Sequence, residues 1–365
     1  MTFNDWAGAQ GIEILPDDRS DVASLLAVLG GLSGDLVAEG RRGEDKMQLA
    51  IRIVDLPGYN AFAISLPAED AVAIHFELAQ SIAATARALA SDLTFFPHWP
   101  SIKSIDPVRF AATPTDIANG SKKISVPPLA DSKRQLLADL LSSMTLAFIH
   151  MHEVSHIYNG HTDWLNRHFR VSAISERPSK EIPLITGLER ETLEWDADCS
   201  AIQYCLRHAL KPSVTTIDGI DRWEINHSTT VSVEDAVKLV FTACLVNTFY
   251  FSSTDWTDPR DRKPRSHPHP FFRSHGVIYQ IATVLNLRTK RDFTEAVQSL
   301  TSHLPQFINS WRGIFANAAP ENYSAWLTSD NFQLSNERIG NWASTWSLMR
   351  PELDRYKRGG RLAPA

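Results

Sequence analysis

The sequence contains few cysteines, no long apolar run and no large excess of charge of either sign. Three cysteines in 365 residues cannot form a disulfide framework, which favours a reducing compartment. The longest apolar stretch, residues 236–251, includes Lys238 and Asn247 and is too short to cross a bilayer. The first residues show no basic region followed by an apolar run, so a signal peptide is not expected. We therefore expect a cytoplasmic protein without a membrane span.

The overall composition is typical of a soluble globular protein. The chain is 43% hydrophobic and 21% charged, and its length is sufficient for a large core. A formal net charge of −6 argues against general nucleic-acid binding. No internal repeat or low-complexity tract is present, and the oligomeric state is left open.

The first 130 residues have the pattern of a mixed α/β lobe. Residues 22–37 are predicted to contain a helix that ends at the glycines or is followed by a turn. Strands are predicted at 47–56 and 61–66. The turn signal Pro57-Gly58 between the strands predicts a hairpin. A further helix is predicted over 68–93. Residues 101–130, rich in proline and polar residues, are expected to connect the two lobes or to form a loop along the cleft.

Residues 131–365 are expected to form one mainly helical domain, which makes the fold class α+β. A long helix is predicted from Asp131, a good N-cap residue, to Asn159-Gly160, a helix stop. Further helices are predicted at about 187–210, 232–251, 276–287 and 292–304. Between them, residues 160–186 show no clear helical pattern, and residues 252–275 form a polar, proline-rich loop.

The predicted long helix carries the sequence His152-Glu-Val-Ser-His156. Side chains four residues apart lie on the same helical face, so both imidazoles can bind one metal ion. Glu153 is turned away by about 100° and could reach a water molecule at that metal. This arrangement is typical of zinc hydrolases.

The next predicted helix offers a third ligand. Glu191, Glu194 and Asp198 fall on one face of it, together with apolar residues. We assign Glu194 as the ligand and Asp198 as the acceptor for the second nitrogen of a ligand histidine, with Glu191 as the alternative ligand. Cys199 and Cys205 are expected in the core rather than at the metal.

Three motifs, in this order, resemble those of the HtpX- and CAAX-prenyl-protease-like gluzincin zinc peptidases. They are His152-Glu-Val-Ser-His156 with its Asn-Gly-His161 ending, Glu194-Trp-Asp-Ala-Asp198, and Ser266-His267-Pro268 followed by Arg273. The resemblance covers about residues 135–275, and the membrane-spanning helices of well-known members are missing. A weaker resemblance is to the phage-exclusion Lit-type cytoplasmic peptidases.

The resemblance implies a zincin-type metallopeptidase core acting on a protein or peptide substrate. Zn²⁺ is then held by His152, His156 and Glu194, and Glu153 activates water as general base.

A donor is also needed for the oxyanion of the reaction. His267 or His269 is the best candidate, because the His-Pro element is duplicated, with Tyr158 and Arg273 behind them. His161 is expected to support the site from the end of the helix.

Two other interpretations remain. One is a highly selective protease with a single protein target. The other is a non-catalytic interaction protein, in which His161 or His269 closes a structural zinc site as fourth ligand.

Overall fold

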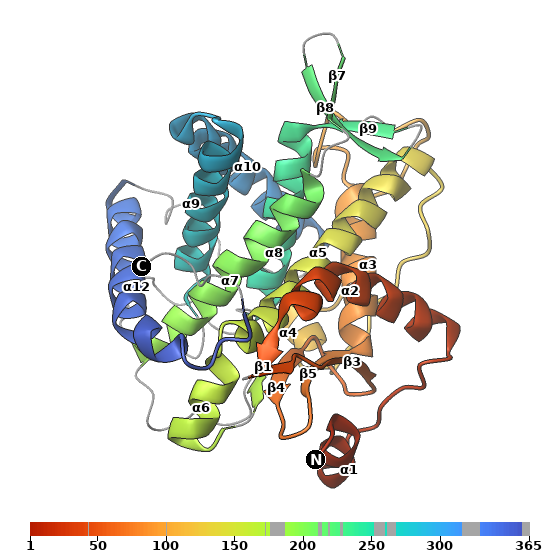
Figure 1. Ribbon diagram of the computed structural model, residues 1–365. Helices are drawn as coiled ribbons and strands as arrows, with labels where there is room; N and C mark the ends of the chain where they lie inside the picture. The colour runs from red at the N-terminus through yellow and green to blue at the C-terminus, as the bar shows by residue number, and fades with distance from the viewer. Residues whose placement is uncertain are drawn as a thin grey trace.

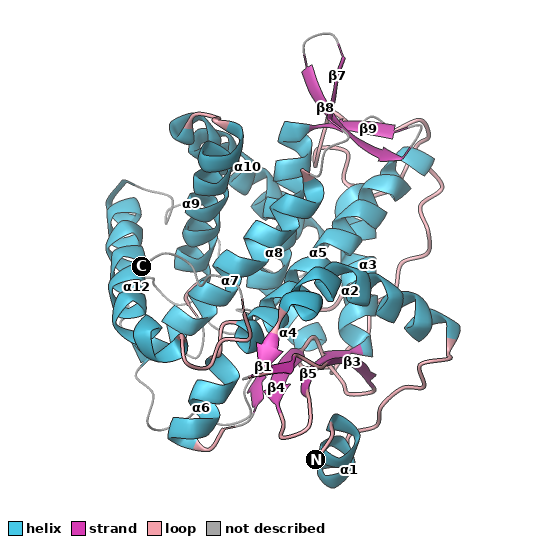
Figure 2. Cartoon of the chain, in the orientation of Figure 1, coloured by secondary structure: helices cyan, strands magenta, loops and turns pink. Residues whose placement is uncertain are grey.

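Helix α5 (Ser132–Tyr158) forms the centre of the fold in this computed structural model. Helices α3 (Phe76–Ser91), α7 (Gly187–Ala209) and α8 (Val233–Phe251) pack against it. A small sheet lies at one end of this helical body, and a second group of strands lies at the other end (Figures 1 and 2). The fold is thus mainly helical α+β, as predicted. The described residues are 1–42, 44–99, 101–171, 173–175, 187–210, 214–217, 220–226, 229–251, 260, 268–315 and 329–359.

The remaining elements complete the two ends and the outer layer. They are α1 (Phe3–Gln10), α2 (Ser20–Glu39), β1 (Arg41–Arg42), β2 (Asp45–Lys46), β3 (Leu49–Val54), β4 (Ala61–Ser65), β5 (Asp70–His75), α4 (Pro114–Ala118), α6 (His161–Phe169), β6 (Ala173–Ser175), β7 (Val214–Ile217), β8 (Ile220–Asn226), β9 (Thr229–Ser232), α9 (Pro270–Thr289), α10 (Phe293–Ile314) and α12 (Ser329–Leu353). The helices predicted at 132–159, 187–210 and 232–251 are confirmed as α5, α7 and α8, and those at 276–287 and 292–304 are parts of α9 and α10. A helix within 22–37 is also confirmed as α2, but it continues through its glycines to Glu39 rather than ending at them.

The larger sheet has the strand order β3-β5-β4-β6, so the predicted hairpin of β3 and β4 is wrong. Strand β5 lies between them: Val72 pairs with Ile51 of parallel β3 and with Ala63 of antiparallel β4. Every residue of β5 is buried. Strand β4 is also buried throughout, and the two buried strands take the two interior positions, where both of their edges are paired. The predicted helix at 68–93 is correspondingly too long, since α3 begins at Phe76.

Both ends of α5 are fixed by local chemistry. The side chain of Asp131 accepts a hydrogen bond of 2.9 Å from the backbone N–H of Arg134, as an N-cap residue does. At the other end Gly160 has a φ of +85°, and a Cβ there would lie 2.7 Å from the backbone of Tyr356. Glycine therefore permits both the left-handed turn and the close approach of the C-terminal segment.

Gly160 redirects the chain into α6, which the sequence did not predict. This helix lies inside the segment 160–186 that lacked a clear helical pattern, and its Trp164 and Leu165 are buried. Its nine residues are too few to show a helical period in sequence. Residues 176–186, directly before α7, and the greater part of the loop at 252–275 lie outside the described residues.

Arg358 joins three parts of the fold. Its Nε donates to Oδ2 of Asp70 in β5 at 2.8 Å, and its Nη1 donates to Oδ2 of Asp163 in α6 at 2.6 Å. Its backbone N–H donates to the carbonyl of Tyr158 at the end of α5. Burial disfavours the charged guanidinium, but the two carboxylates raise the pKa of Arg358 above its ordinary value. The C-terminal segment thereby holds the sheet, α6 and α5 together.

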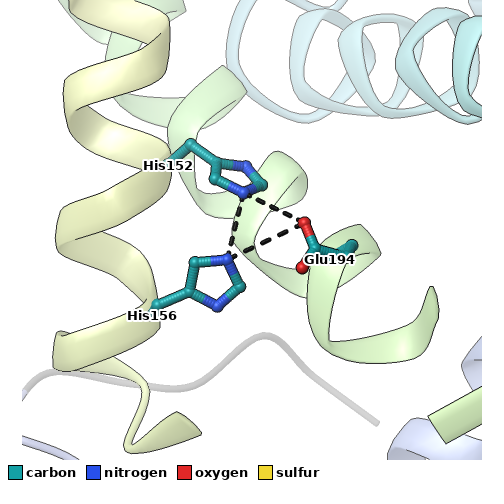
Figure 3. Close-up of side chains that lie close together, drawn as sticks. All are labelled: His152, His156 and Glu194. Carbon is teal, nitrogen blue, oxygen red and sulfur yellow. Dashed lines mark hydrogen bonds and ion pairs between the residues drawn. The ribbon is translucent and has the colours of Figure 1, made fainter. Parts of the chain in front are cut away.

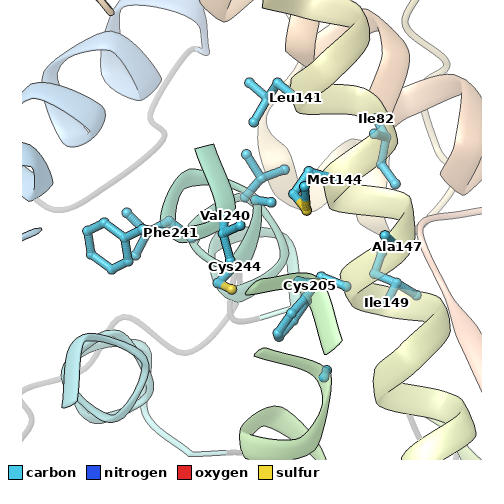
Figure 4. Packing of buried hydrophobic residues seen from close by; sticks show 14 of the residues in the cluster. Ile82, Leu141, Met144, Ala147, Ile149, Cys205, Val240, Phe241 and Cys244 are labelled. Atoms are coloured by element: carbon cyan, nitrogen blue, oxygen red, sulfur yellow. The ribbon is translucent and has the colours of Figure 1, made fainter. Parts of the chain in front are cut away.

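The main core lies around α5 and α8 (Figure 4). The three cysteines are buried and free, and Cys205 and Cys244 belong to this core cluster. Burial raises the pKa of the Cys205 thiol to about 12. The expected burial of Cys199 and Cys205 is therefore confirmed.

Within the described residues, α2 is the one helix long and apolar enough to cross a membrane, a test that core helices of soluble proteins also pass. It packs on the fold through the buried residues Val22, Leu29, Ser33 and Leu36. The Ser33 hydroxyl lies 3.0 Å from Nε2 of His150 in α5.

Candidate metal centre

His152 and His156 lie one turn apart on α5 and direct their Nε2 atoms toward Glu194 of α7 (Figure 3). The two Nε2 atoms are 3.0 Å apart. Glu194 Oε2 lies 3.3 Å from Nε2 of His152 and 3.9 Å from Nε2 of His156. All three residues are at most 2% exposed. Together they form a buried triad that could hold a metal ion.

The separations within the triad fit one shared ion. Ligand atoms bound at about 2 Å around a tetrahedral ion lie about 3.3 Å from one another. The three observed separations, from 3.0 to 3.9 Å, are close to this value. The packing of α7 on α5 supplies this geometry, since each helix contributes ligands from its buried face.

The outer nitrogen of His152 is oriented by a buried ion pair. Its Nδ1 lies 2.9 Å from Oδ1 of Asp198, one turn after Glu194 on α7. Arg273 of α9 donates from Nε and Nη2 to the same carboxylate, at 2.7 and 2.8 Å. Burial opposes ionisation of Asp198, but the charge of Arg273 and the hydrogen bond from His152 lower the pKa of this carboxyl. An ionised carboxylate only accepts, so Nδ1 of His152 carries the hydrogen.

The outer nitrogen of His156 is also oriented by polar side chains. Its Nδ1 lies 3.0 Å from Nδ1 of His161, the first residue of α6. Nε2 of His161 lies 3.1 Å from Oδ2 of Asp196. That contact is electrostatic rather than an aligned hydrogen bond, and it favours a hydrogen on Nε2 of His161. Nδ1 of His161 then accepts, and Nδ1 of His156 donates.

With both Nδ1 atoms protonated, the two Nε2 atoms present lone pairs to each other at 3.0 Å. Glu194 adds a carboxylate oxygen to the same buried point. Concentrated negative potential of this kind is unfavourable away from water unless a cation or a proton offsets it. With these tautomers the electrostatic potential of the triad therefore favours a positive ion.

Glu153 and Glu191 lie outside the triad. Glu153 follows His152 on α5 and is fully buried. Glu191, the alternative ligand, accepts from Nη2 of Arg338 at 2.6 Å and from Nε1 of Trp342 at 3.0 Å. The structure thus brings Glu194 rather than Glu191 to the two histidines.

The candidate oxyanion donors are distributed differently. His267 lies outside the described residues. His269 is the N-cap residue of α9: its Nδ1 accepts from the backbone N–H of Phe271 at 3.1 Å, which gives it a structural role. Arg273 faces Asp198, whereas Tyr158 lines a separate pocket bounded by α2, α5 and α7. The oxyanion role of His267 or His269 stays a prediction.

Sequence reasoning missed Asp196 and Asn159. Asn159 donates from Nδ2 to Oδ2 of Asp196 at 2.6 Å, which fixes the carboxylate that faces His161. Asp196 lies two residues after Glu194 and so points to another side of α7, outside the helical face that sequence reasoning considered. The turn at Gly160 brings His161 to that side. The sequence feature that could have indicated this contact is the Asn-Gly-His161 ending of the motif at His152–His156.

No family model matches this chain, and no curated protein or solved structure is similar to it. The interpretation of the triad therefore depends on its own geometry.

Proposed function

We propose that this protein is a zinc-dependent metallopeptidase, with zinc bound by His152, His156 and Glu194. One observation carries the proposal: two histidine Nε2 atoms and a carboxylate oxygen meet in a buried triad whose outer nitrogens are oriented by separate polar chains. Two histidines and one carboxylate, with a position left for water, are the ligand set of catalytic zinc.

In this proposal the metal supplies Lewis-acid chemistry by lowering the pKa of water and polarising the scissile carbonyl. Glu153 takes one proton as the water oxygen bonds to the carbonyl carbon. It then gives that proton to the amine nitrogen as the C–N bond breaks. The second water proton remains with the products, a carboxylic acid and an amine. His267 or His269 is proposed to donate a hydrogen bond to the oxyanion.

The contacts of His161 favour a catalytic over a structural zinc site. A structural site needs a fourth protein ligand, and His161 was one candidate. Both ring nitrogens of His161 already face partners, Nδ1 that of His156 and Nε2 the carboxylate of Asp196. His269 is engaged in capping α9. A structural zinc ion would also give no chemical function to Glu153, which directly follows the proposed ligand His152.

We propose further that the enzyme is cytoplasmic and selective for its protein or peptide substrate. Three buried free thiols suit a reducing compartment. Ligands at most 2% exposed favour a site that admits few substrates over one that cleaves any unfolded chain.

The test compares zinc-loaded wild-type protein with Glu153→Gln on a library of peptides, with products identified by mass spectrometry. Glu153→Gln should bind zinc as wild type does and hydrolyse about 10²–10⁴-fold more slowly, the usual contribution of a general base. Asp139→Asn, an exposed acid on the same helix, is the matched control and should cleave normally. Cleavage at the wild-type rate by zinc-loaded Glu153→Gln would remove Glu153 from the mechanism.

A further inference from the structure

A second cavity lies on α5, bounded by α2 on one side and α7 on the other. It measures about 990 Å³ with its open mouth included. Each helix contributes residues of one face, and the floor is formed by Leu36 of α2, Met151 of α5 and Cys205 of α7, all buried. The cavity shares no lining residue with the metal triad. An apolar floor with a few polar groups around it is the usual construction of a small-molecule site.

A buried phenol reaches this cavity. Tyr158 is 6% exposed, and its hydroxyl makes no hydrogen bond to any described residue. Tyr204 of α7 lines the same cavity and likewise makes no such bond within the described chain. The two phenols therefore offer hydroxyl groups to an occupant, as donors or as acceptors.

Charges of opposite sign line the two walls. Asp35 and Glu39 follow each other by one turn on the α2 wall, and Arg207 lies on the α7 wall. Across the part of the chain that the structure describes, none of these three side chains forms an ion pair. A ligand that carries a positive and a negative group on an apolar body is therefore complementary to the acidic wall, the basic wall and the apolar floor.

We propose that this cavity binds a zwitterionic amino acid or short peptide with free termini and an apolar side chain. The ammonium group faces Asp35 and Glu39, the carboxylate faces Arg207, and the side chain lies on the floor. The Tyr158 hydroxyl donates to the carboxylate or accepts from the ammonium group. The inference does not depend on the proposed peptidase activity, because no group of the triad takes part.

The probes are L-leucine and the dipeptide Leu-Leu, titrated calorimetrically into the full chain. Both probes are titrated into the Glu153→Gln variant, in which hydrolysis of the dipeptide is slow. Saturable binding at one site is expected, and the tighter probe identifies the source, free amino acid or peptide. N-acetyl-leucine lacks the ammonium group and leucinamide lacks the carboxylate, so each should bind about tenfold more weakly. Equal binding of leucinamide, or no binding of either probe, would overturn the proposal.

Two glycines of α2 provide a matched pair of blocking variants. A Cβ at Gly31 or at Gly34 would meet no atom within 4 Å, so neither substitution strains the helix. Gly31 lines the cavity and Gly34 does not. Gly31→Gln should abolish leucine binding, while Gly34→Gln should preserve it. Arg207→Gln should weaken binding about tenfold, and Arg312→Gln, an exposed arginine on α10, should not change it. Unchanged binding in both Gly31→Gln and Arg207→Gln would place the ligand elsewhere and contradict the assignment.

Discussion

Nδ1 of His156 lies 3.0 Å from Nδ1 of His161, so the end of α5 and the start of α6 meet at the outer nitrogen of a proposed metal ligand. Asp196 fixes the other side of the His161 ring and is itself held by Asn159. Polar partners of this kind set the tautomer and the orientation of a ligand histidine. His161 and Asp196 are therefore positioning residues for His156.

The first prediction concerns His161 and Asp196. Replacing His161 by Phe, or Asp196 by Asn, should weaken zinc binding about 10–100-fold, as loss of an orienting partner does. The measurement is competition with a chromophoric chelator. His168→Ala, a partly exposed histidine of the same helix, is the control and should bind zinc normally. Wild-type zinc affinity in both His161→Phe and Asp196→Asn would show that these two residues do not orient His156.

A second prediction distinguishes the two glutamates of α7. Glu194→Gln removes a charged ligand and should leave little zinc bound after dialysis. Glu191→Gln should retain zinc and lose stability instead, because Arg338 and Trp342 lose their carboxylate partner. Zinc content and the urea midpoint are measured on both variants. Loss of zinc from Glu191→Gln with retention by Glu194→Gln would reverse the ligand assignment.

The third prediction concerns the C-terminal contact. Arg358→Ala leaves Asp70, which is fully buried, without its closest cation, and should lower the free energy of unfolding by about 3–5 kcal/mol. Arg355→Ala, an exposed neighbour, should change it by no more than about 0.5 kcal/mol. Urea unfolding of both variants measures the difference. Equal stability would mean that the buried pair contributes little beyond its desolvation cost.

The fourth prediction is a loss of stability in mild acid. Burial lowers the pKa of His150, His275 and His303 to about 4, below the 6.5 of an ordinary histidine. The unfolded chain therefore takes up protons first, so stability is complete above pH 6.5 and falls as the pH approaches 4. At pH 5 each of these histidines lowers the free energy of unfolding by about 2 kcal/mol relative to its value well above pH 6.5.

Urea unfolding of chelator-treated protein at pH 7.5 and pH 5 measures this loss without a contribution from metal. His275→Phe is the informative variant, because the ring lies between Phe271 and Phe332 and has no polar partner among the described residues. This variant should lose about 2 kcal/mol less than wild type between the two pH values. The same loss in both proteins would show that His275 does not titrate as its burial requires.

The sequence predicted the parts of the site that depend on helical spacing. His152 and His156 follow from a separation of four residues, and the face shared by Glu191, Glu194 and Asp198 indicates where the third ligand lies. Only the structure distinguishes Glu194 from Glu191. Asp196 was missed because its contact with His161 depends on the turn at Gly160, a tertiary feature that no helical period records. The bounds of α5 were predicted well because Asp131, Asn159 and Gly160 act locally.

The errors in the fold have the same origin. Residues 70–75 were assigned to a helix because alanine-rich sequence favours one, yet tertiary packing makes them an interior strand of the sheet. The order of β3, β5 and β4 is likewise a non-local choice, which the turn at Pro57-Gly58 could not reveal. The division of the chain near residue 130 stays a prediction.

The most direct test of the account is the metal content and coordination of protein purified without added metal. We expect close to one zinc ion per chain, and X-ray absorption should show two imidazole nitrogens and two oxygens, one from Glu194 and one from water. Glu194→Gln, purified and measured in the same way, should contain little zinc. No bound zinc after zinc is supplied, or a shell closed by a third imidazole, would contradict the catalytic metal centre.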